Sequence, residues 1–128
     1  MERLVAAAIS ARERAYAPYS NYKVGAALLT KQGKIYTGCN VENASYGASI
    51  CAERTAVVKA VSEGETEFEA IAIVTDDPSL GSPCGICRQF LAEFGTDIRL
   101  IIANLNGAKI ERTLKEYLPY AFGPDYLK

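Results

Sequence analysis

The pattern of apolar and polar positions along the chain predicts helices and strands in alternation. A helix is expected to open the chain because apolar residues keep a helical period there until Pro18 approaches. Ser82 and Pro83 are expected as the N-cap and first residue of a later helix. Helices are predicted over about 2–16, 49–63 and 82–94, with a short one over 113–118, and strands over 22–29, 35–42, 69–75, 98–105 and 108–113.

The connections between these segments indicate how the strands pair. Residues 31–34 read Lys-Gln-Gly-Lys and residues 106–107 read Asn-Gly, which are turn sequences that favour antiparallel hairpins. Strands separated by a helix favour parallel pairing, so the sheet is expected to be mixed. No repeat or linker interrupts the chain. We therefore predict one α/β domain over residues 1–128, a three-layer α/β/α sandwich with a five-stranded mixed sheet.

Composition places the chain among ordinary globular domains and argues against two classes of partner. It is 49% hydrophobic and 23% charged, and its net charge of −1 argues against a nucleic-acid-binding protein. No apolar run approaches the roughly 18 residues of a membrane span. The first 17 residues, MERLVAAAISARERAYA, lack the apolar core of a secretory signal, so a cytoplasmic protein is expected.

The chain contains no histidine, which excludes His-based nucleophilic sites, His metal ligands and His general bases. Proton transfer must then fall to Asp, Glu, Lys, Tyr or a thiol. The four cysteines are Cys39, Cys51, Cys84 and Cys87. Without a secretory signal, metal ligands or reactive thiols are expected rather than disulfides.

Two predicted helix starts carry three of these thiols. Cys84 and Cys87 are three residues apart and share a helix face, while Cys51 and Glu53 open another helix. Side chains of a first turn tilt toward the N-terminus, so the thiols are expected to converge beyond both helix ends. Pockets in open α/β sheets lie at the C-terminal edge of the strands, and helix N-termini stabilise thiolates.

Three thiolates around Zn²⁺ leave one tetrahedral position open, as in a catalytic site. Glu53 then becomes the natural proton shuttle, since no histidine is present. Arg54 and Gln89 are candidates for positions behind the ligands, where Arg54 would offset the charge of the sulfurs by donating hydrogen bonds. Both residues are also consistent with ordinary polar positions on a helix.

Several motifs together resemble the small cytidine deaminases, which are zinc hydrolases of pyrimidine salvage. They are CAERTA at 51–56, SPCGICRQ at 82–89, AYAPYS at 15–20, VGAAL at 24–28, GCNVENASYG at 38–47 and LPYAF at 118–122. The resemblance implies hydrolysis of cytidine and deoxycytidine to uridine and deoxyuridine, with release of ammonia. It also implies one zinc per subunit on Cys51, Cys84 and Cys87, Glu53 as proton shuttle, and antiparallel pairing of the last two strands.

The same resemblance implies a set of substrate contacts. Asn40 and Glu42 would bind the ribose hydroxyls, and Tyr22 stands where the family has an aromatic residue, usually Phe. The backbone at Ala52 and Ser82 would bind the cytosine edge. The family's small members are homotetramers that share active sites between subunits, which makes further residues candidates for contacts with a neighbour's pocket: Ala44, Tyr46 and Phe122. The expected partner is a free nucleoside, with neither nucleic acid nor membrane.

Other interpretations of these residues remain open. Cys39 as a fourth ligand would make the zinc structural, although a small buried thiol is its ordinary role within a strand. Cys84 and Cys87 alone also fit a redox dithiol, which would leave Cys51 and Glu53 without a role. A non-catalytic deaminase-like module would be expected to have a broken motif. A relative acting on a nucleobase or another aminopyrimidine would not need a ribose clamp.

Overall fold

The computed structural model describes residues 1–80 and 83–127 and confirms the predicted order of elements. Each predicted helix and strand is present, within a few residues of the predicted bounds. Two short 3₁₀ segments, one in the loop before the second helix and one near the C-terminus, were not predicted. The elements are α1 (Glu2–Arg12), β1 (Gly25–Thr30), β2 (Ile35–Cys39), η1 (Tyr46–Ala48), α2 (Ala52–Ser62), β3 (Phe68–Thr75), α3 (Gly85–Ala92), β4 (Arg99–Asn104), β5 (Lys109–Thr113), α4 (Leu114–Tyr117) and η2 (Pro124–Leu127).

The five strands form one mixed sheet in the order β2-β1-β3-β4-β5. β3 and β4 pair in parallel, whereas β1 pairs antiparallel with both β2 and β3, and β4 pairs antiparallel with β5. The turn between β4 and β5 uses Gly107 at a φ of 93°, a conformation that glycine adopts without strain. The predicted mixed sheet and the antiparallel last pair are therefore confirmed.

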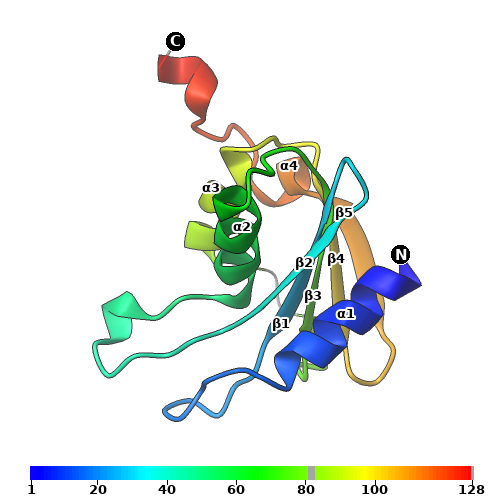
Figure 1. Cartoon of the computed structure of the whole chain (residues 1–128), viewed down its shortest axis with the longest axis vertical. Coiled ribbons are helices and arrows are strands. Elements are labelled where there is room, and N and C mark those ends of the chain that lie inside the picture. Colours follow the sequence, from blue (N-terminus) through cyan, green and yellow to red (C-terminus); the bar gives the residue numbers. More distant parts are fainter. Residues whose placement is uncertain (81–82, 128) are drawn as a thin grey trace.

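Helices cover both faces of the sheet (Figure 1): α1 lies on one face, and α2 and α3 lie on the other. Alternate side chains along β3 point to opposite faces of the sheet, so one strand contributes to the core on each face. Ala70, Ala72 and Val74 join the core beneath α1, while Ile71 and Ile73 join the core beneath α2 and α3. The three-layer α/β/α prediction is confirmed, and the smaller side chains on the α1 face bring that helix close to the sheet.

Two glycines allow helices to touch strands directly. A Cβ on Gly25 would lie 2.0 Å from the carbonyl oxygen of Ala8 in α1. A Cβ on Gly38 in β2 would lie 2.5 Å from the backbone nitrogen of Ala56 in α2. Neither contact leaves space for a side chain, so Gly38 sets how closely the first half of α2 approaches the sheet.

The structure corrects several predicted boundaries. Pro83 is not the first residue of α3; Cys84 is the N-cap, with φ −65° and ψ 162°, and Gly85 begins the helix. Ser82, the predicted N-cap, lies outside the described residues. The strands predicted to begin at Tyr22 and to end at Glu42 are shorter: β1 begins at Gly25 and β2 ends at Cys39, and the side chain of Asn40 bonds to the backbone of Tyr22 and Val24. Across the described ranges, no helix is long and apolar enough to cross a membrane.

Candidate metal centre and active site

Three cysteine sulfurs meet where the N-termini of α2 and α3 converge. Cys51 is the N-cap of α2, Cys84 is the N-cap of α3, and Cys87 lies in the first turn of α3. The Sγ atoms of Cys51 and Cys84 are 3.6 Å apart, those of Cys84 and Cys87 are 3.4 Å apart, and all three lie within 4.8 Å of one another. Neither N-cap cysteine makes a side-chain capping bond, so both thiols face one another at the positive ends of two helices.

This arrangement fits a zinc ion. Zn–S bonds of about 2.3 Å in a tetrahedral site require sulfurs about 3.8 Å apart, which is close to the observed spacing. Cys87 is buried, Cys51 is half-buried and Cys84 is exposed, so the group is open on one side. Three sulfurs with an open side are the donor set of a catalytic zinc rather than of a closed structural one.

Contacts within the cluster shift the pKa values of two of its thiols in opposite directions. Cys51 makes a hydrogen bond with the thiol of Cys87, and this bond, aided by Arg54, lowers the pKa of Cys51 to about 5. The same interaction with Cys51, together with burial, raises the pKa of Cys87. The lowered pKa of Cys51 favours its thiolate, which is the form that binds a metal, and a bound cation would displace the remaining protons.

Arg54 and Gln89, the two polar residues predicted behind the ligands, occupy different places. The Nη2 atom of Arg54 donates to the carbonyl oxygen of Ser49 at 3.1 Å and lies 4.0 Å from Sγ of Cys51. The amide of Gln89 donates to the carbonyl oxygen of Phe122 at 2.7 Å, in the C-terminal segment. The structure therefore brings Arg54 to the sulfurs, and it directs Gln89 toward the C-terminal segment.

Glu53 is the acidic group beside this cluster. Its side chain is 5% exposed, and burial, with a smaller contribution from the charge of Cys51, raises its pKa to about 7. A carboxyl that titrates near neutral pH both accepts and donates protons readily, which suits a general acid and base. The start of α2 thus brings a cysteine sulfur and a buried carboxyl into one site, with Cys51 at the N-cap and Glu53 in the first turn.

A cavity of about 250 Å³ opens over Cys51, Glu53 and Cys84. Three residues predicted for the substrate also line it, namely Tyr22, Asn40 and Ala52. Four lining residues were not predicted: Val24, Ile73, Thr75 and Pro83. Thr75 ends β3, and the rule that ligands bind at the carboxyl ends of strands is the signal that would have found it.

Asn40 and Glu42 both hold the loop that precedes β1. The amide of Asn40 accepts a hydrogen bond from the Val24 N–H at 2.9 Å and donates to the Tyr22 carbonyl at 2.7 Å. The carboxylate of Glu42 accepts bonds from the backbone of Tyr19 and from the hydroxyl and backbone of Ser20.

These contacts place the two residues differently. Asn40 lines the cavity over the sulfurs, whereas Glu42 lines a neighbouring cavity of about 310 Å³. The hydroxyl of Ser20 is the main reason why the pKa of Glu42 lies below its ordinary value.

The residues predicted to reach a neighbouring subunit are all exposed. Tyr46 is 76% exposed and packs edge-on against Tyr19, with ring centroids 6.0 Å apart. It belongs to a segment that also carries Ala44 and projects from the body of the molecule (Figure 1). Phe122 is 56% exposed and stacks on Tyr126.

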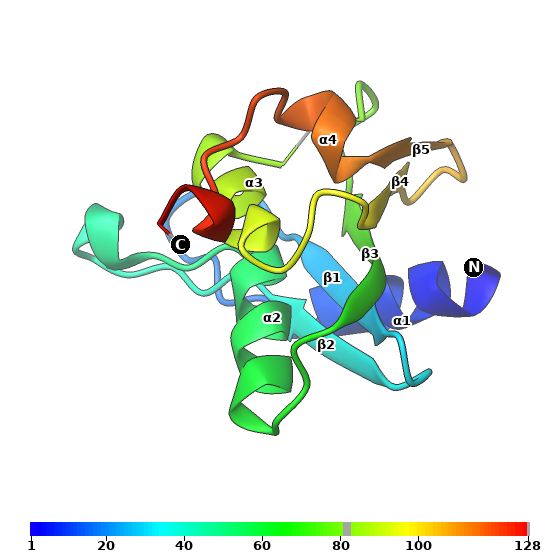
Figure 2. The ribbon, with the colours of Figure 1, turned by 90° about the horizontal axis from the view of Figure 1, so that it is seen from above.

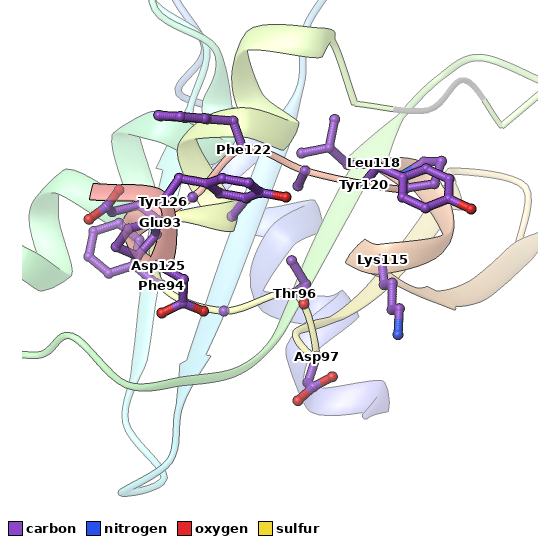
Figure 3. Close-up of a pocket in the computed structure, with 16 residues that line it drawn as sticks. Glu93, Phe94, Thr96, Asp97, Lys115, Leu118, Tyr120, Phe122, Asp125 and Tyr126 are labelled. Carbon is purple, nitrogen blue, oxygen red and sulfur yellow. The ribbon is translucent and has the colours of Figure 1, made fainter. Parts of the chain in front are cut away.

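Phe122 lines a second, larger cavity of about 870 Å³ between α3, α4 and the C-terminal segment (Figure 3). Carboxylates and aromatic rings line this space, including Asp97, Tyr120 and Asp125, and no cysteine does. The larger cavity therefore lacks the groups on which the predicted chemistry depends.

Cys39 does not belong to the sulfur group. Its thiol donates to the carbonyl oxygen of Arg14 at 3.4 Å, and only Cys51, Cys84 and Cys87 form the possible metal-binding group among the described residues. The geometry thus opposes Cys39 as a fourth ligand. It also opposes an isolated redox pair, because Cys51 and Glu53 lie within the same site.

Comparison with known proteins agrees with this geometry. The family model described as the cytidine and deoxycytidylate deaminase zinc-binding region matches residues 1–103. The chain belongs to this family. The match spans α1 to β4 and therefore includes the three cysteines and Glu53.

Individual members of the cytidine and deoxycytidylate deaminase family are similar along nearly their whole length. A cytidine deaminase of Sporosarcina psychrophila is 48% identical over 128 residues, which cover 99% of this chain and 94% of that protein. A cytidine deaminase of Halalkalibacterium halodurans is 51% identical over 122 residues, which cover 94% of this chain and 92% of that protein. The crystal structure of cytidine deaminase from Burkholderia pseudomallei superposes with a TM-score of 0.92 at 48% identity, covering 94% of this chain and 98% of that one.

Proposed function

We propose that this protein is a zinc-dependent hydrolase that converts cytidine and deoxycytidine to uridine and deoxyuridine and releases ammonia. The observation that carries the proposal is the buried carboxyl of Glu53, which shares a cavity with the open side of a three-sulfur cluster. The names of the relatives supply the substrate class, since those with nearly full-length similarity are cytidine deaminases.

Cys51, Cys84 and Cys87 would hold one zinc ion per subunit. When bound, zinc lowers the pKa of a coordinated water and so supplies a nucleophile near neutral pH. Arg54 offsets part of the negative charge of the three thiolates. Glu53 would accept a proton from the attacking water and deliver it to N3 of the cytosine ring. It would then take a second proton from the hydroxyl formed on C4 and pass it to the departing amino group, which leaves as ammonia.

The residues around the cavity would orient the nucleoside. Tyr22 packs against it, and the backbone of Ala52 binds the cytosine edge; Ser82, expected to do the same, lies outside the described residues. Asn40 and Glu42 bind the ribose hydroxyls. Neither of the cavities that these two residues line has a Lys or Arg among its described lining residues, which favours a neutral nucleoside over a nucleotide.

The protein would work as a cytoplasmic homotetramer. In that assembly Ala44, Tyr46 and Phe122 contact the pocket of a neighbouring subunit. The support is that all three residues are exposed, and that several other aromatic side chains are exposed as well. Burying such side chains is a strong driving force for association.

Ammonia release from four substrates tests the proposal. The zinc-loaded protein is expected to act on cytidine and deoxycytidine, and to act poorly on cytosine and on cytidine 5′-monophosphate. Cytosine lacks the ribose that Asn40 and Glu42 would bind, and the monophosphate brings a charge that no described lining residue neutralises. Equal activity on cytosine and cytidine would refute the ribose role, and no activity on either nucleoside would refute the function.

A further inference from the structure

Arg88 connects the metal-binding loop to a distant part of the chain. It follows Cys87 directly and lies one helical turn after Cys84. Its backbone N–H donates to the carbonyl oxygen of Cys84 at 3.0 Å, and its side-chain Nε donates to the carbonyl oxygen of Pro83 at 2.8 Å. One residue therefore holds both peptide groups that flank Cys84.

The other end of the guanidinium reaches α4. Nη1 of Arg88 donates to the carbonyl oxygen of Tyr117 at 3.1 Å, and the guanidinium carbon lies 5.8 Å from the centre of the Tyr117 ring. Tyr117 is the last residue of α4, where carbonyl groups lack helical partners and favour a cation. Residues 83 and 117 are thus joined through a single side chain.

We propose that Arg88 is a positioning residue: it fixes the main chain around Cys84 against α4 and so presets the spacing of the three sulfurs. The inference rests on the proposed function in so far as the cluster is taken to hold zinc. The planar guanidinium offers donors in a fixed geometry, so it holds the carbonyls of Pro83 and Tyr117 at the same time. A lysine has a single donor atom and reaches only one of them.

Cys84 needs this support more than the other two sulfurs do. Cys87 is buried within α3, and the guanidinium of Arg54 lies beside Cys51. Cys84 is exposed and is an N-cap in an extended conformation that makes no side-chain capping bond. Groups that orient metal ligands from behind commonly change metal affinity 10–100-fold when they are removed.

The test is the zinc affinity of the holoprotein, measured by competition with a chromogenic chelator at equilibrium. Arg88→Met keeps an unbranched side chain but removes the side-chain hydrogen bonds to the carbonyls of Pro83 and Tyr117, so its zinc affinity is expected to fall 10–100-fold. The zinc affinity of Arg88→Lys is expected to lie between those of Arg88→Met and the wild type. Tyr117→Leu removes the ring but keeps the carbonyl, so it is expected to change affinity less than about threefold.

Two controls separate positioning from general destabilisation. Arg99→Met removes a half-buried arginine of β4, which pairs with Glu111 of β5 at 3.3 Å, and is expected to leave zinc affinity unchanged. Ile101→Val trims the core beneath α1 and is expected to lower the melting temperature without changing zinc affinity. If Ile101→Val and Arg88→Met have the same melting temperature and lose the same zinc affinity, the positioning role is wrong.

The outcomes distinguish this inference from the proposed function. An Arg88→Met protein that binds zinc within threefold of the wild type overturns the inference; if that variant does not fold, unchanged affinity in Arg88→Lys overturns it instead. Neither result bears on cytidine hydrolysis by the wild type. Conversely, a zinc-loaded wild type that does not hydrolyse cytidine overturns the proposed function and leaves the role of Arg88 intact.

Discussion

The cavity over the sulfurs and the C-terminal segment differ in what holds their side chains. Around the sulfurs, two helix N-termini and the end of β3 converge, and Glu53 and Pro83 are buried. Residues 118–127 are less buried: Tyr120 is fully exposed, Phe122 is 56% exposed, and the amide of Gln89 donates to the Phe122 carbonyl oxygen. Seen from above, this segment lies over α3 rather than within the layers (Figure 2).

The comparison shows that cavity size and chemical competence are separate properties. The larger cavity, beside the C-terminal segment, has acidic and aromatic side chains among its described lining residues, and it lies apart from the three sulfurs. The smaller one contains a carboxyl that burial has brought to a pKa of about 7. Rigid secondary-structure ends produce such shifts because they hold a polar group away from water.

Replacing the carboxyl of Glu53 is expected to have the largest effect. Glu53→Gln keeps the shape of the side chain but cannot carry a proton, so kcat for cytidine should fall by about 10²–10⁴. Zinc content, measured by atomic absorption, should not change, since Glu53 is not a proposed ligand. The matched control is Glu93→Gln in the larger cavity, which should retain wild-type activity. Equal losses in the two variants would remove the distinction between the cavities.

Substitutions at two glycines test whether close packing supports the metal centre more than it supports the C-terminal segment. In Gly38→Ala the new Cβ would lie 2.5 Å from the backbone of Ala56, so α2 must move and stability should fall by about 1–3 kcal/mol. Zinc affinity should fall as well, because α2 carries Cys51. In Gly123→Ala the Cβ would meet nothing within 4 Å, so thermal unfolding and zinc affinity should match the wild type. A stable, zinc-binding Gly38→Ala protein would contradict the close packing of α2.

The C-terminal segment is expected to matter only when subunits share their sites. Phe122→Ala should raise KM for cytidine about tenfold, the effect of losing roughly 1.4 kcal/mol of binding, with little change in melting temperature. Sedimentation of the variant provides the control, since its oligomeric state should be retained when other aromatic contacts remain. An unchanged KM would indicate that the exposed ring plays no part in substrate binding.

The fold could be predicted largely because apolar periodicity and turn residues act locally. Asn106-Gly107 identified the β4–β5 hairpin, and the apolar run over 69–75 predicted the strand that the structure shows as β3, buried on both faces. Strand ends were predicted less well. Tyr22–Val24 and Asn40–Glu42 read as strand but lie outside β1 and β2. Both side-chain and backbone bonds to residues distant in the sequence hold them, and no local pattern encodes those contacts.

The sulfur cluster was predictable for a different reason. Spacing placed Cys84 and Cys87 on one face, and the sulfur of Cys51 indeed joins them. Arg88 was not singled out, because its role depends on Tyr117, whose position relative to α3 is set only by the complete fold. Likewise Gln89 faces the C-terminal segment, a contact across 33 residues of sequence.

The smallest expected effect is on thermal stability and concerns Glu42, which holds the loop before β1 by accepting hydrogen bonds from Ser20. The hydroxyl and backbone of Ser20 lower the pKa of Glu42 in the folded state below its ordinary value of 4.5. The charged carboxylate therefore stabilises the fold above pH 4.5, and this contribution is lost as the pH falls through the lowered pKa. Glu42→Gln should melt slightly below the wild type at pH 7 and pH 5, and the two melting curves should converge in acid.

Ser20→Ala provides the matched control for this effect. If the two side chains act as a pair, Ser20→Ala should reproduce most of the loss at pH 7, and the double variant should lose less than the sum of the single losses. Additive losses would show that Glu42 acts independently of Ser20. A difference in melting temperature between Glu42→Gln and the wild type that grows in acid would contradict a stabilising, hydrogen-bonded carboxylate. In that case the loop before β1 would be held by Asn40 and the backbone instead.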